Sequence, residues 1–349
     1  NLYCIDVDNV SLANLMWSSA NNSIDSWTSF STNCSSDLGC TDSTACNYNL
    51  LATIDDGSCI LTNCVTNITQ NTFSTTIQAA IDSSNNGDTI IVSPGTYIEP
   101  NTPYHVNTSF STGPNVYQKN NLLIKSDGNG SAIIDLNDSY FGFCFSDLSS
   151  NNIIDGFTLK NADEYLITAM NNSINNTFQN CVFLTIGGEE RTAHIGYSGY
   201  KFINCTFIGD GTNDVIAFGS NGSADITNSI IYDYDSFIDL NDLSGLNISY
   251  SNIYNVDNNI TSGIGVFMLD PLFVDTLNGD FHLSNFSPCI GAGLDTSIVP
   301  TTDLDGNPRP NPVGSNPDMG AYENALALPD VLGCMDSLAT NYNASANIS

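Results

Sequence analysis

Short segments in which apolar residues alternate with polar or small ones recur through the middle of the chain. Residues 178–183 (FQNCVF) recur as residues 202–207 (FINCTF) and 226–231 (ITNSII), each 24 residues after the last. Weaker copies lie at 153–158 and 248–253, so the period drifts between 22 and 25 residues. Asn, Gly, Asp and Ser separate the copies. The pattern predicts short strands joined by turns, one coil per copy, and it fits helical or leucine-rich repeats poorly.

Stacking such coils places equivalent residues above one another at the strand spacing of about 4.8 Å. We expect one internal column of small residues and a neighbouring column of asparagines. These columns are Cys181, Cys205 and Ser229, and Asn180, Asn204 and Asn228. Stacked amides donate and accept along the axis, and Asn tolerates a left-handed bend, so the second column indicates a parallel β-helix. We interpret the stacked cysteines as small buried hydrophobes rather than a disulfide.

An amphipathic segment precedes the first coil. In residues 74–83, Ile77, Ala80 and Ile81 have helical spacing behind Ser and Thr capping residues. Residues 87–97 then give a β-branched strand and a Pro-Gly turn. Because an uncapped coil end leaves an open strand edge, we predict that the helix and strand form a lid over the first coil.

Composition and charge narrow the partners. With 41% hydrophobic and 10% aromatic residues the chain can form a core. Six basic residues against 37 acidic ones give a net charge of −31, which excludes nucleic acid and disfavours anionic membranes. Apolar stretches such as 264–269 are too short to span a bilayer, so we expect no membrane insertion. Asn1 begins no signal peptide, so we expect any export signal outside this sequence.

Cysteine usage indicates the compartment. The chain has 11 Cys, and four of them lie between Cys40 and Cys64. Such density is typical of an oxidised, extracellular disulfide framework. We therefore expect a secreted protein that is extracellular or attached to a cell surface.

Several motifs resemble the opening and closing segments of pectate-lyase-like β-helix proteins from marine Bacteroidetes. They lie at 77–81, 87–97, 270–273, 279–283, 287–293, 303–309 and 318–323. The resemblance spans roughly residues 70–325 and is specific for architecture, not for chemistry. We call residues 270–323 the closing segment. With the repeats, it predicts an all-β fold, a right-handed single-stranded parallel β-helix (a solenoid) with small disulfide-rich flanking modules.

Both flanks carry further resemblances. Residues 39–49 (GCTDSTACNYN) with 55–59 (DDGSC) resemble the GCTD-type modules of giant secreted proteins of the same bacteria. Residues 333–343 are a second copy, 294 residues on, in which Thr340 replaces Cys46 and which stops before a DDGSC half. Residues 1–34 resemble the closing cap of leucine-rich-repeat regions. The resemblance implies one link of a longer tandem chain exported by type IX secretion.

The predicted domains follow from these resemblances. They are 1–35, the closing cap of a preceding leucine-rich-repeat-like module; 36–66, the Cys-rich GCTD-type module; 67–330, the parallel β-helix with its N-terminal helical cap; and 331–349, the start of a second GCTD-type module.

Two oxygen-rich turns are candidate calcium sites, because Ca²⁺ takes several carboxylate and carbonyl oxygens on a tight loop. The first combines Asp42, Asn47, Asn49, Asp55 and Asp56, with Gly57 at the bend. Its spacing departs from the EF-hand loop, and a disulfide-stapled knot with solvated acids is the alternative. The second turn contains Asp303, Asp305 and Asn307, and a closing cap whose side chains bond to backbone explains it equally well.

Polysaccharide cleavage is the enzymatic alternative. A lyase needs a basic residue to remove a proton next to a uronate. The basic candidates are Arg309, Arg191, Lys125, Lys160 and Lys201. A charge of −31 repels a polyuronate within a Debye length of about 8 to 10 Å. A hydrolase needs two facing carboxylates roughly 5 to 9 Å apart. The candidates are Asp210, Asp214, Asp233, Asp235 and Asp239. We interpret them rather as solvated acids at turns.

Histidines and tyrosines add weaker candidates. His105, His194 and His282 have no ligand partner at metal spacing, so we interpret them as structural. Four tyrosines on neighbouring coils form either a sugar-stacking face, an exposed ladder or a contact to a second chain. They are Tyr232, Tyr234, Tyr250 and Tyr254.

The function predicted from the sequence is a non-catalytic structural or adhesive segment of a large secreted cell-surface or filament-forming protein. We expect no catalytic residue and no cofactor besides Ca²⁺. The expected partners are neighbouring modules of the same chain, further copies in a homo-oligomer or filament, and cell-surface polysaccharide or another cell. A β-helix lyase or hydrolase is the alternative.

Overall fold

The computed structural model describes residues 4–17, 29–32, 38–99, 102–104, 107–128, 132–186, 191–219, 221–238, 245–257 and 263–348 of the chain. They form two compact units, Asn1–Cys64 and Val65–Ser349. No helix in the described part is long and apolar enough to cross a membrane. His105 and Asp239, two of the residues considered above, lie outside the described residues.

The first unit has little regular structure. Its elements are β1 (Cys4–Asp6), α1 (Val10–Met16), β2 (Ser29–Ser31), β3 (Leu38–Gly39) and β4 (Ile54–Asp55). The pairs β1–β2 and β3–β4 are both parallel. Two disulfides, Cys40–Cys59 and Cys46–Cys64, cross-link residues 40–64. The predicted oxidised framework is thus confirmed, whereas the assignment of residues 1–35 to a leucine-rich-repeat cap stays a prediction.

Residues 332–348 repeat the backbone of residues 38–54. The matching contacts are the bridges Cys40–Tyr48 and Cys334–Tyr342, and the hydrogen bonds from Asn49 N to Cys40 O and from Asn343 N to Cys334 O, both of 2.9 Å. The turns also match, because Asp42 and Asp336 each accept from the backbone N–H two residues on. Cys334 forms no disulfide. Local turn chemistry therefore suffices to give the second copy this backbone.

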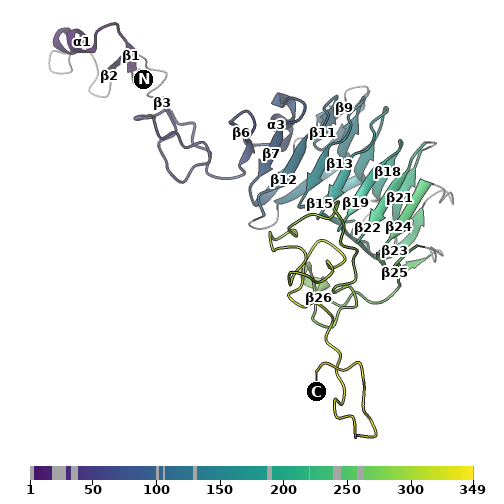
Figure 1. Cartoon of the computed structure of the whole chain (residues 1–349). Coiled ribbons are helices and arrows are strands. Elements are labelled where there is room, and N and C mark those ends of the chain that lie inside the picture. Colours follow the sequence, from purple (N-terminus) through teal and green to yellow (C-terminus); the bar gives the residue numbers. More distant parts are fainter. Residues whose placement is uncertain are drawn as a thin grey trace. The chain divides into compact units, whose positions relative to one another are not determined.

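The second unit is a β-solenoid built mainly from two parallel sheets. One sheet contains β7 (Thr89–Val92), β12 (Leu123–Ser126), β14 (Ile153–Asp155), β16 (Thr177–Gln179), β19 (Tyr200–Ile203), β22 (Ala224–Thr227) and β24 (Leu246–Ser249), with β5 (Val65–Asn67) and β6 (Thr72–Ser74) antiparallel at its start. Figure 1 shows these strands stacked in chain order, from blue to green. Each coil therefore adds one strand to the same sheet.

The second sheet contains the rest of each coil. Its strands are β8 (Gly95–Ile98), β9 (Thr102–Tyr104), β10 (Asn107–Thr112), β11 (Asn115–Tyr117), β13 (Ala132–Ser146), β15 (Phe157–Ala169), β17 (Val182–Leu184), β18 (Arg191–Ile195), β20 (Thr206–Ile208), β21 (Asp214–Phe218), β23 (Ile230–Ile238) and β25 (Asn252–Asp257). The closing segment contains η3 (Thr276–Asn278) and a separate antiparallel pair of strands, β26 (Phe273–Asp275) and β27 (Asp280–Leu283). The predicted β-helix is confirmed.

Strand register confirms the 24-residue repeat. Phe178 pairs with Phe202, and Phe202 with Ile226, which pairs with Ile248. Phe178 and Phe202 stack inside the coil with ring centroids 5.6 Å apart. The weak copy at 153–158 was placed one residue out of register, because Ile154, not Ile153, pairs with Phe178. Periodicity fixes the coil, but a drifting period leaves single-residue errors at its ends.

The internal column of small residues is also confirmed. Cys181, Cys205 and Ser229 are fully buried, and both cysteines are free thiols. Cys205 N donates to Ser229 Oγ over 3.1 Å, so the column is hydrogen-bonded between coils.

The asparagine column makes the expected left-handed bend but not the expected amide ladder. Asn180, Asn204 and Asn228 have φ of 51°, 52° and 52°. Between them the amides share only one long contact, from Asn228 Nδ2 to Asn204 Oδ1 at 3.5 Å. Each Nδ2 donates instead to a backbone carbonyl of the closing segment. These carbonyls belong to Thr302 at 2.9 Å, Asp318 at 2.9 Å and Leu294 at 3.0 Å. The column therefore fastens the closing segment to the coil.

A second asparagine ladder, not predicted from the sequence, lies inside the coil. Asn176 Oδ1 accepts from both the backbone N–H and the side-chain amide of Asn152, at 3.0 and 2.9 Å. Its Nδ2 donates to the hydroxyl of Tyr200 at 2.9 Å. All three residues are fully buried. The ladder satisfies polar groups that would otherwise destabilise the core.

The predicted lid over the first coil is present. α3 (Ile77–Ser83) begins after Thr76, whose side chain accepts from Ala79 N, and it buries Ile77, Ala80 and Ile81. In Figure 1, α3 lies beside β7 at the blue end of the coil. Glu99 reinforces it, because its carboxylate accepts from the N–H groups of Ile77 and Gln78 at 2.8 and 3.2 Å.

The closing segment covers a side of the coil, where outward apolar residues would otherwise meet water. Val182 and Ile208 point outward from successive coils and pack against Phe281, Leu304 and Ala321. A neighbouring cluster joins Ile230 of β23 to residues of the same segment, Leu283, Cys289, Ile290 and Met319. These two small cores lie outside the main one, and Figure 1 shows the yellow segment against the coil.

We predict that Asn204 stabilises the second unit through both its bend and its amide. Asn204→Gly keeps the left-handed backbone but loses the bonds to the closing segment, at about 1–3 kcal/mol. Asn204→Ala loses the same bonds and also puts at positive φ a residue that tolerates this region less well than Gly or Asn, so it should lose up to about 1 kcal/mol more. Urea unfolding of the three proteins measures both losses. Equal stability of all three would show that neither interaction matters.

Candidate functional site

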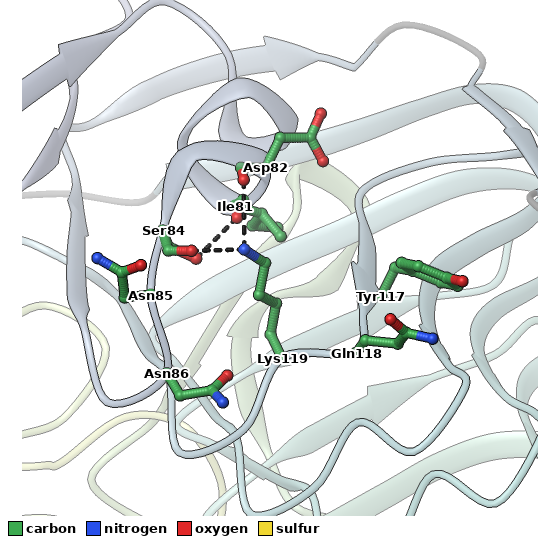
Figure 2. Close-up of a pocket in the computed structure, with 8 residues that line it drawn as sticks. All are labelled: Ile81, Asp82, Ser84, Asn85, Asn86, Tyr117, Gln118 and Lys119. Atoms are coloured by element: carbon green, nitrogen blue, oxygen red, sulfur yellow. Dashed lines mark hydrogen bonds between the residues drawn. The ribbon is translucent and has the colours of Figure 1, made fainter.

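A polar cleft of about 450 Å³ opens beside the lid. It is lined by the end of α3, the turn that follows it, and the end of β11 with the two residues after it. The lining residues are Ile81, Asp82, Ser84, Asn85, Asn86, Tyr117, Gln118 and Lys119. Figure 2 shows Asn85 and Asn86 on one side of Lys119, and Tyr117 and Gln118 on the other.

Lys119 holds this cleft together. Its Nζ donates to the carbonyl oxygens of Asp82, at 3.2 Å, and of Ser84. A cation at this end of α3 also complements the helix dipole. Asp82 is anchored in turn, since its carboxylate accepts from Gln78 Nε2 over 2.7 Å. One ammonium and one carboxylate leave the lining without net charge.

Sequence reasoning missed this site. The site depends on Lys119, the one Lys or Arg of six that is absent from the basic candidates above. The scarcity of basic residues in the chain was the only signal that could have pointed to it. The two walls come from residues more than 30 positions apart, which the lid brings together.

Arg191 is the basic residue nearest to acids on the second sheet. It lies between Glu164, at 3.1 Å, and Asp214, at 3.6 Å, all partly exposed. Its Cζ also lies 5.9 Å from the ring centroid of Tyr165, which stacks on Phe141. The guanidinium is thus neutralised by two carboxylates, and it braces neighbouring coils. It is not free to neutralise a uronate.

The other basic candidates do not converge on a groove. Lys160 pairs with Asp135 at 3.5 Å, and Lys201 is exposed on β19. Lys125 lines a separate cavity of about 210 Å³ against the closing segment. The structure therefore brings none of these lysines together with Arg191.

Arg309 lies in the closing segment with a fully buried side chain. It pairs with Glu323 at 2.9 Å and donates to the carbonyls of Asp318 and Gly320 at 3.1 and 3.2 Å. Burial, with the nearby Glu323 charge, raises the pKa of Asp318 to about 7. Both Asp318 oxygens accept backbone N–H groups, from Gly291 and Asn324. This buried network stabilises the closing segment and does not face a substrate.

The second oxygen-rich turn belongs to the same network. Asp303 accepts from the backbone N–H groups of Asp305 and Asn307 at 3.0 and 2.7 Å, and from that of Glu323 at 2.9 Å. This is the closing-cap arrangement, in which the carboxylate is saturated by backbone donors.

Four of the five calcium candidates of the first unit accept a backbone N–H in a local turn, and Asn47 bonds to the more distant residues 58 and 60. Asp42, Asp55 and Asp56 each accept from the N–H two residues on. Asn47 uses both ends of its amide, accepting from Ile60 N at 2.8 Å and donating to Ser58 O at 2.7 Å, and Asn49 accepts from Leu51 N. Among the described residues no three His, Cys, Asp or Glu side chains are placed to hold one metal ion. The donor set fits the solvated knot better, and calcium binding stays a prediction.

Among the hydrolase candidates, Asp210 lies at a turn, whereas Asp214 lies on β21 and Asp233 and Asp235 lie on β23. Asp210 accepts from Thr212 N and Oγ1 at 3.1 and 2.5 Å, and Asp214 accepts from Ser236 Oγ at 2.5 Å besides facing Arg191. Asp233 accepts from the amide of Asn255, and Asp235 is exposed. The turn-acid interpretation therefore fits Asp210 but not the three acids that lie on strands.

Two histidines lie among the described residues. His194 packs on Tyr165 with centroids 5.3 Å apart, and burial lowers its pKa. His282 lies between Asp305, 2.7 Å from Nε2, and Asp280, 2.6 Å from Nδ1. The hydrogen bond to Asp305, with that to Asp280, raises the pKa of His282 to about 9. His282 therefore forms an ion pair with Asp305 that joins β27 to the turn at Asp305. We call this contact the His282 clip.

The four tyrosines do not form one sugar-stacking face. Tyr232 and Tyr254 stack with centroids 5.9 Å apart, but Phe273 of the closing segment packs on Tyr232. Tyr234 is buried, and its hydroxyl contacts those of Thr185 and Thr192. A face that includes Tyr234 is wrong, because its side chain points into the core.

Comparison with known proteins adds one likeness. No protein-family model matches the chain, and no curated protein matches it in sequence. A solved structure, the "Crystal structure of pectate lyase Pel9A", is similar at a TM-score of 0.37 and 15% identity, over 71% of this chain and 90% of that one.

We predict that the His282 clip weakens at alkaline pH. The histidine pKa is about 6.5 when unfolded and about 9 when folded, so its stabilisation is complete below about pH 6.5 and is lost as pH rises through about 9. Because the group is partly exposed, we expect about 1 kcal/mol. Thermal midpoints between pH 6 and 10 should fall in the parent and in His194→Gln, but stay flatter in His282→Gln. The same fall in all three proteins would refute the clip.

We also predict that the fold is more sensitive to loss of the buried Arg309 than to loss of an exposed basic residue. Arg309→Met leaves the buried Glu323 uncompensated and should lose about 3–5 kcal/mol of unfolding free energy. Arg309→Met with Glu323→Gln should lose less than the sum of the single changes. Lys160→Met, at the exposed pair, is the control and should lose under about 1 kcal/mol. Urea denaturation measures all four, and a mild Arg309→Met effect would contradict the argument.

Proposed function

We propose that this chain is a non-catalytic structural and adhesive segment of a large secreted cell-surface or filament-forming protein. The observation that carries the proposal is the repeated module, whose backbone contacts recur 294 residues later at matching positions, such as Cys40–Tyr48 and Cys334–Tyr342. A module found twice in one chain, with a solenoid between the copies, is the organisation expected of a tandem protein that spans distance.

The distribution of charged groups supports this proposal. Arg191 and Arg309 are paired with carboxylates, and Lys119 with carbonyl groups. General acid–base catalysis needs a group that is free to exchange a proton with a bound substrate. The raised pKa values of Asp318 and His282 arise from burial and from contacts within the closing segment. Both have structural explanations.

The proposal also covers the type of the two flanking modules and the route of export. We infer that residues 36–66 and 331–349 are GCTD-type modules of a giant surface protein from a marine bacterium of the Bacteroidetes, exported by type IX secretion. The two disulfides agree with an oxidising exterior. The partners we propose are neighbouring modules, further copies in a homo-oligomer or filament, and polysaccharide or another cell.

An activity assay tests the non-catalytic assignment. The purified chain, incubated with pectate, alginate or ulvan, should release no unsaturated or reducing ends above a boiled control. Arg191→Ala and its matched control Lys201→Ala should behave like the parent. Release of ends that is lost in Arg191→Ala and kept in Lys201→Ala would replace the adhesive proposal with a lyase.

A binding assay tests adhesion itself. Beads coated with the chain should attach to immobilised cell-wall polysaccharide, and electron microscopy of the full-length protein should show elongated particles. Compact particles that attach to nothing would overturn the proposal.

A further inference from the structure

We propose that the cleft between α3 and residues 117–119 binds a short stretch of a neutral glycan. The inference rests on the proposed adhesive function and gives it a ligand class. The volume of about 450 Å³ lies within the ~300–1,000 Å³ typical of small-ligand sites.

The side chains around the cleft suit hydroxyl groups. Asn85 and Gln118 are exposed and lie on opposite sides of Lys119 in Figure 2. Asn86 uses its Oδ1 to accept from Asn120 N at 2.9 Å, so its NH₂ group is the part of the amide that can donate to a ligand. An amide offers both donors and acceptors, as a sugar hydroxyl does. Amides on two walls can therefore bind one sugar ring from both edges.

Tyr117 adds an apolar contact to this polar lining. Its ring lies on the wall next to Gln118 in Figure 2 and is partly exposed. A tyrosine ring presents a flat apolar face and a polar tip, so it can pack on the C–H face of a sugar. Stacking and edge-on hydrogen bonds together select a ring that has one apolar face and hydroxylated edges.

The walls are fixed before any ligand arrives. Lys119 Nζ uses two of its three donors on Asp82 O and Ser84 O, which ties the end of α3 to the strand on the opposite wall. A preformed site loses less conformational entropy on binding. The third donor remains to contact a hydroxyl.

Charge selects a neutral ligand over an acidic one. The cleft has one Asp and one Lys, so it contributes no net attraction for a carboxylate. The chain as a whole carries −31, which repels acidic polymers at the surface. A neutral glycan meets neither obstacle.

Titration of the full 349-residue chain tests the inference. The probes are cello-, laminari-, manno- and xylotetraose, with tetragalacturonate as the acidic comparison, monitored by calorimetry and ligand-observed NMR. We expect millimolar binding of at least one neutral tetrasaccharide and at least tenfold weaker binding in Asn85→Ala with Gln118→Ala. Asn247→Ala, at an exposed amide on β24, is the matched control and should bind like the parent.

Each other outcome counts against the cleft in a distinct way. Binding that survives the double variant, or falls equally in Asn247→Ala, rejects this location, and tighter binding of tetragalacturonate rejects the neutral class. If no tetrasaccharide binds while coated beads still attach to polysaccharide, the cleft fails and the adhesive function stands. If the beads also fail to attach, the adhesive function fails as well.

Discussion

The second unit depends on one backbone constraint, the left-handed bend that each central coil makes after its first strand. Asn180, Asn204 and Asn228 all adopt φ near 51–52°. Asn enters this region at less cost than other residues with a Cβ. The bend turns the chain from the first sheet into the second, so that β17, β20 and β23 follow at equivalent places. The same bend points the amides outward, where they find the closing segment rather than each other.

The bend leaves apolar side chains on the outside of the coil, and the closing segment is needed to cover them. Val182, Ile208 and Ile230 face outward after the bend, and an apolar strip along a solenoid has to be covered. The segment supplies apolar partners and satisfies its own irregular backbone through buried polar side chains. Arg309 donates to two carbonyls, while Asp303 accepts three backbone N–H groups. Its polar groups are therefore part of the fold, although acids and a buried Arg look catalytic in a list of residues.

Much of the coil could be predicted from the sequence because its information is local and repeated. A 24-residue period gives both strand spacing and register, and Cys181 and Cys205 share a column as expected. The interior ladder of Asn152, Asn176 and Tyr200 could not be found in this way, because its third member breaks the chemical identity on which self-similarity depends. The alternation of apolar and polar residues also does not predict that a distant segment covers the outward-facing apolar side chains.

The site was harder to predict than the fold for a related reason. Lys119 and Asp82 meet only because the lid docks on the first coil, and no period relates their positions. Residues that resemble catalytic groups, by contrast, were visible in the sequence, and the structure satisfies them internally. Equivalent positions of successive coils lie about 4.8 Å apart, so a charge on one coil is stabilised by an opposite charge on the next coil. Arg191 between Glu164 and Asp214 follows that rule. A binding function is therefore best sought at the end of the stack, where the lid interrupts the repeat and polar groups remain open to a ligand.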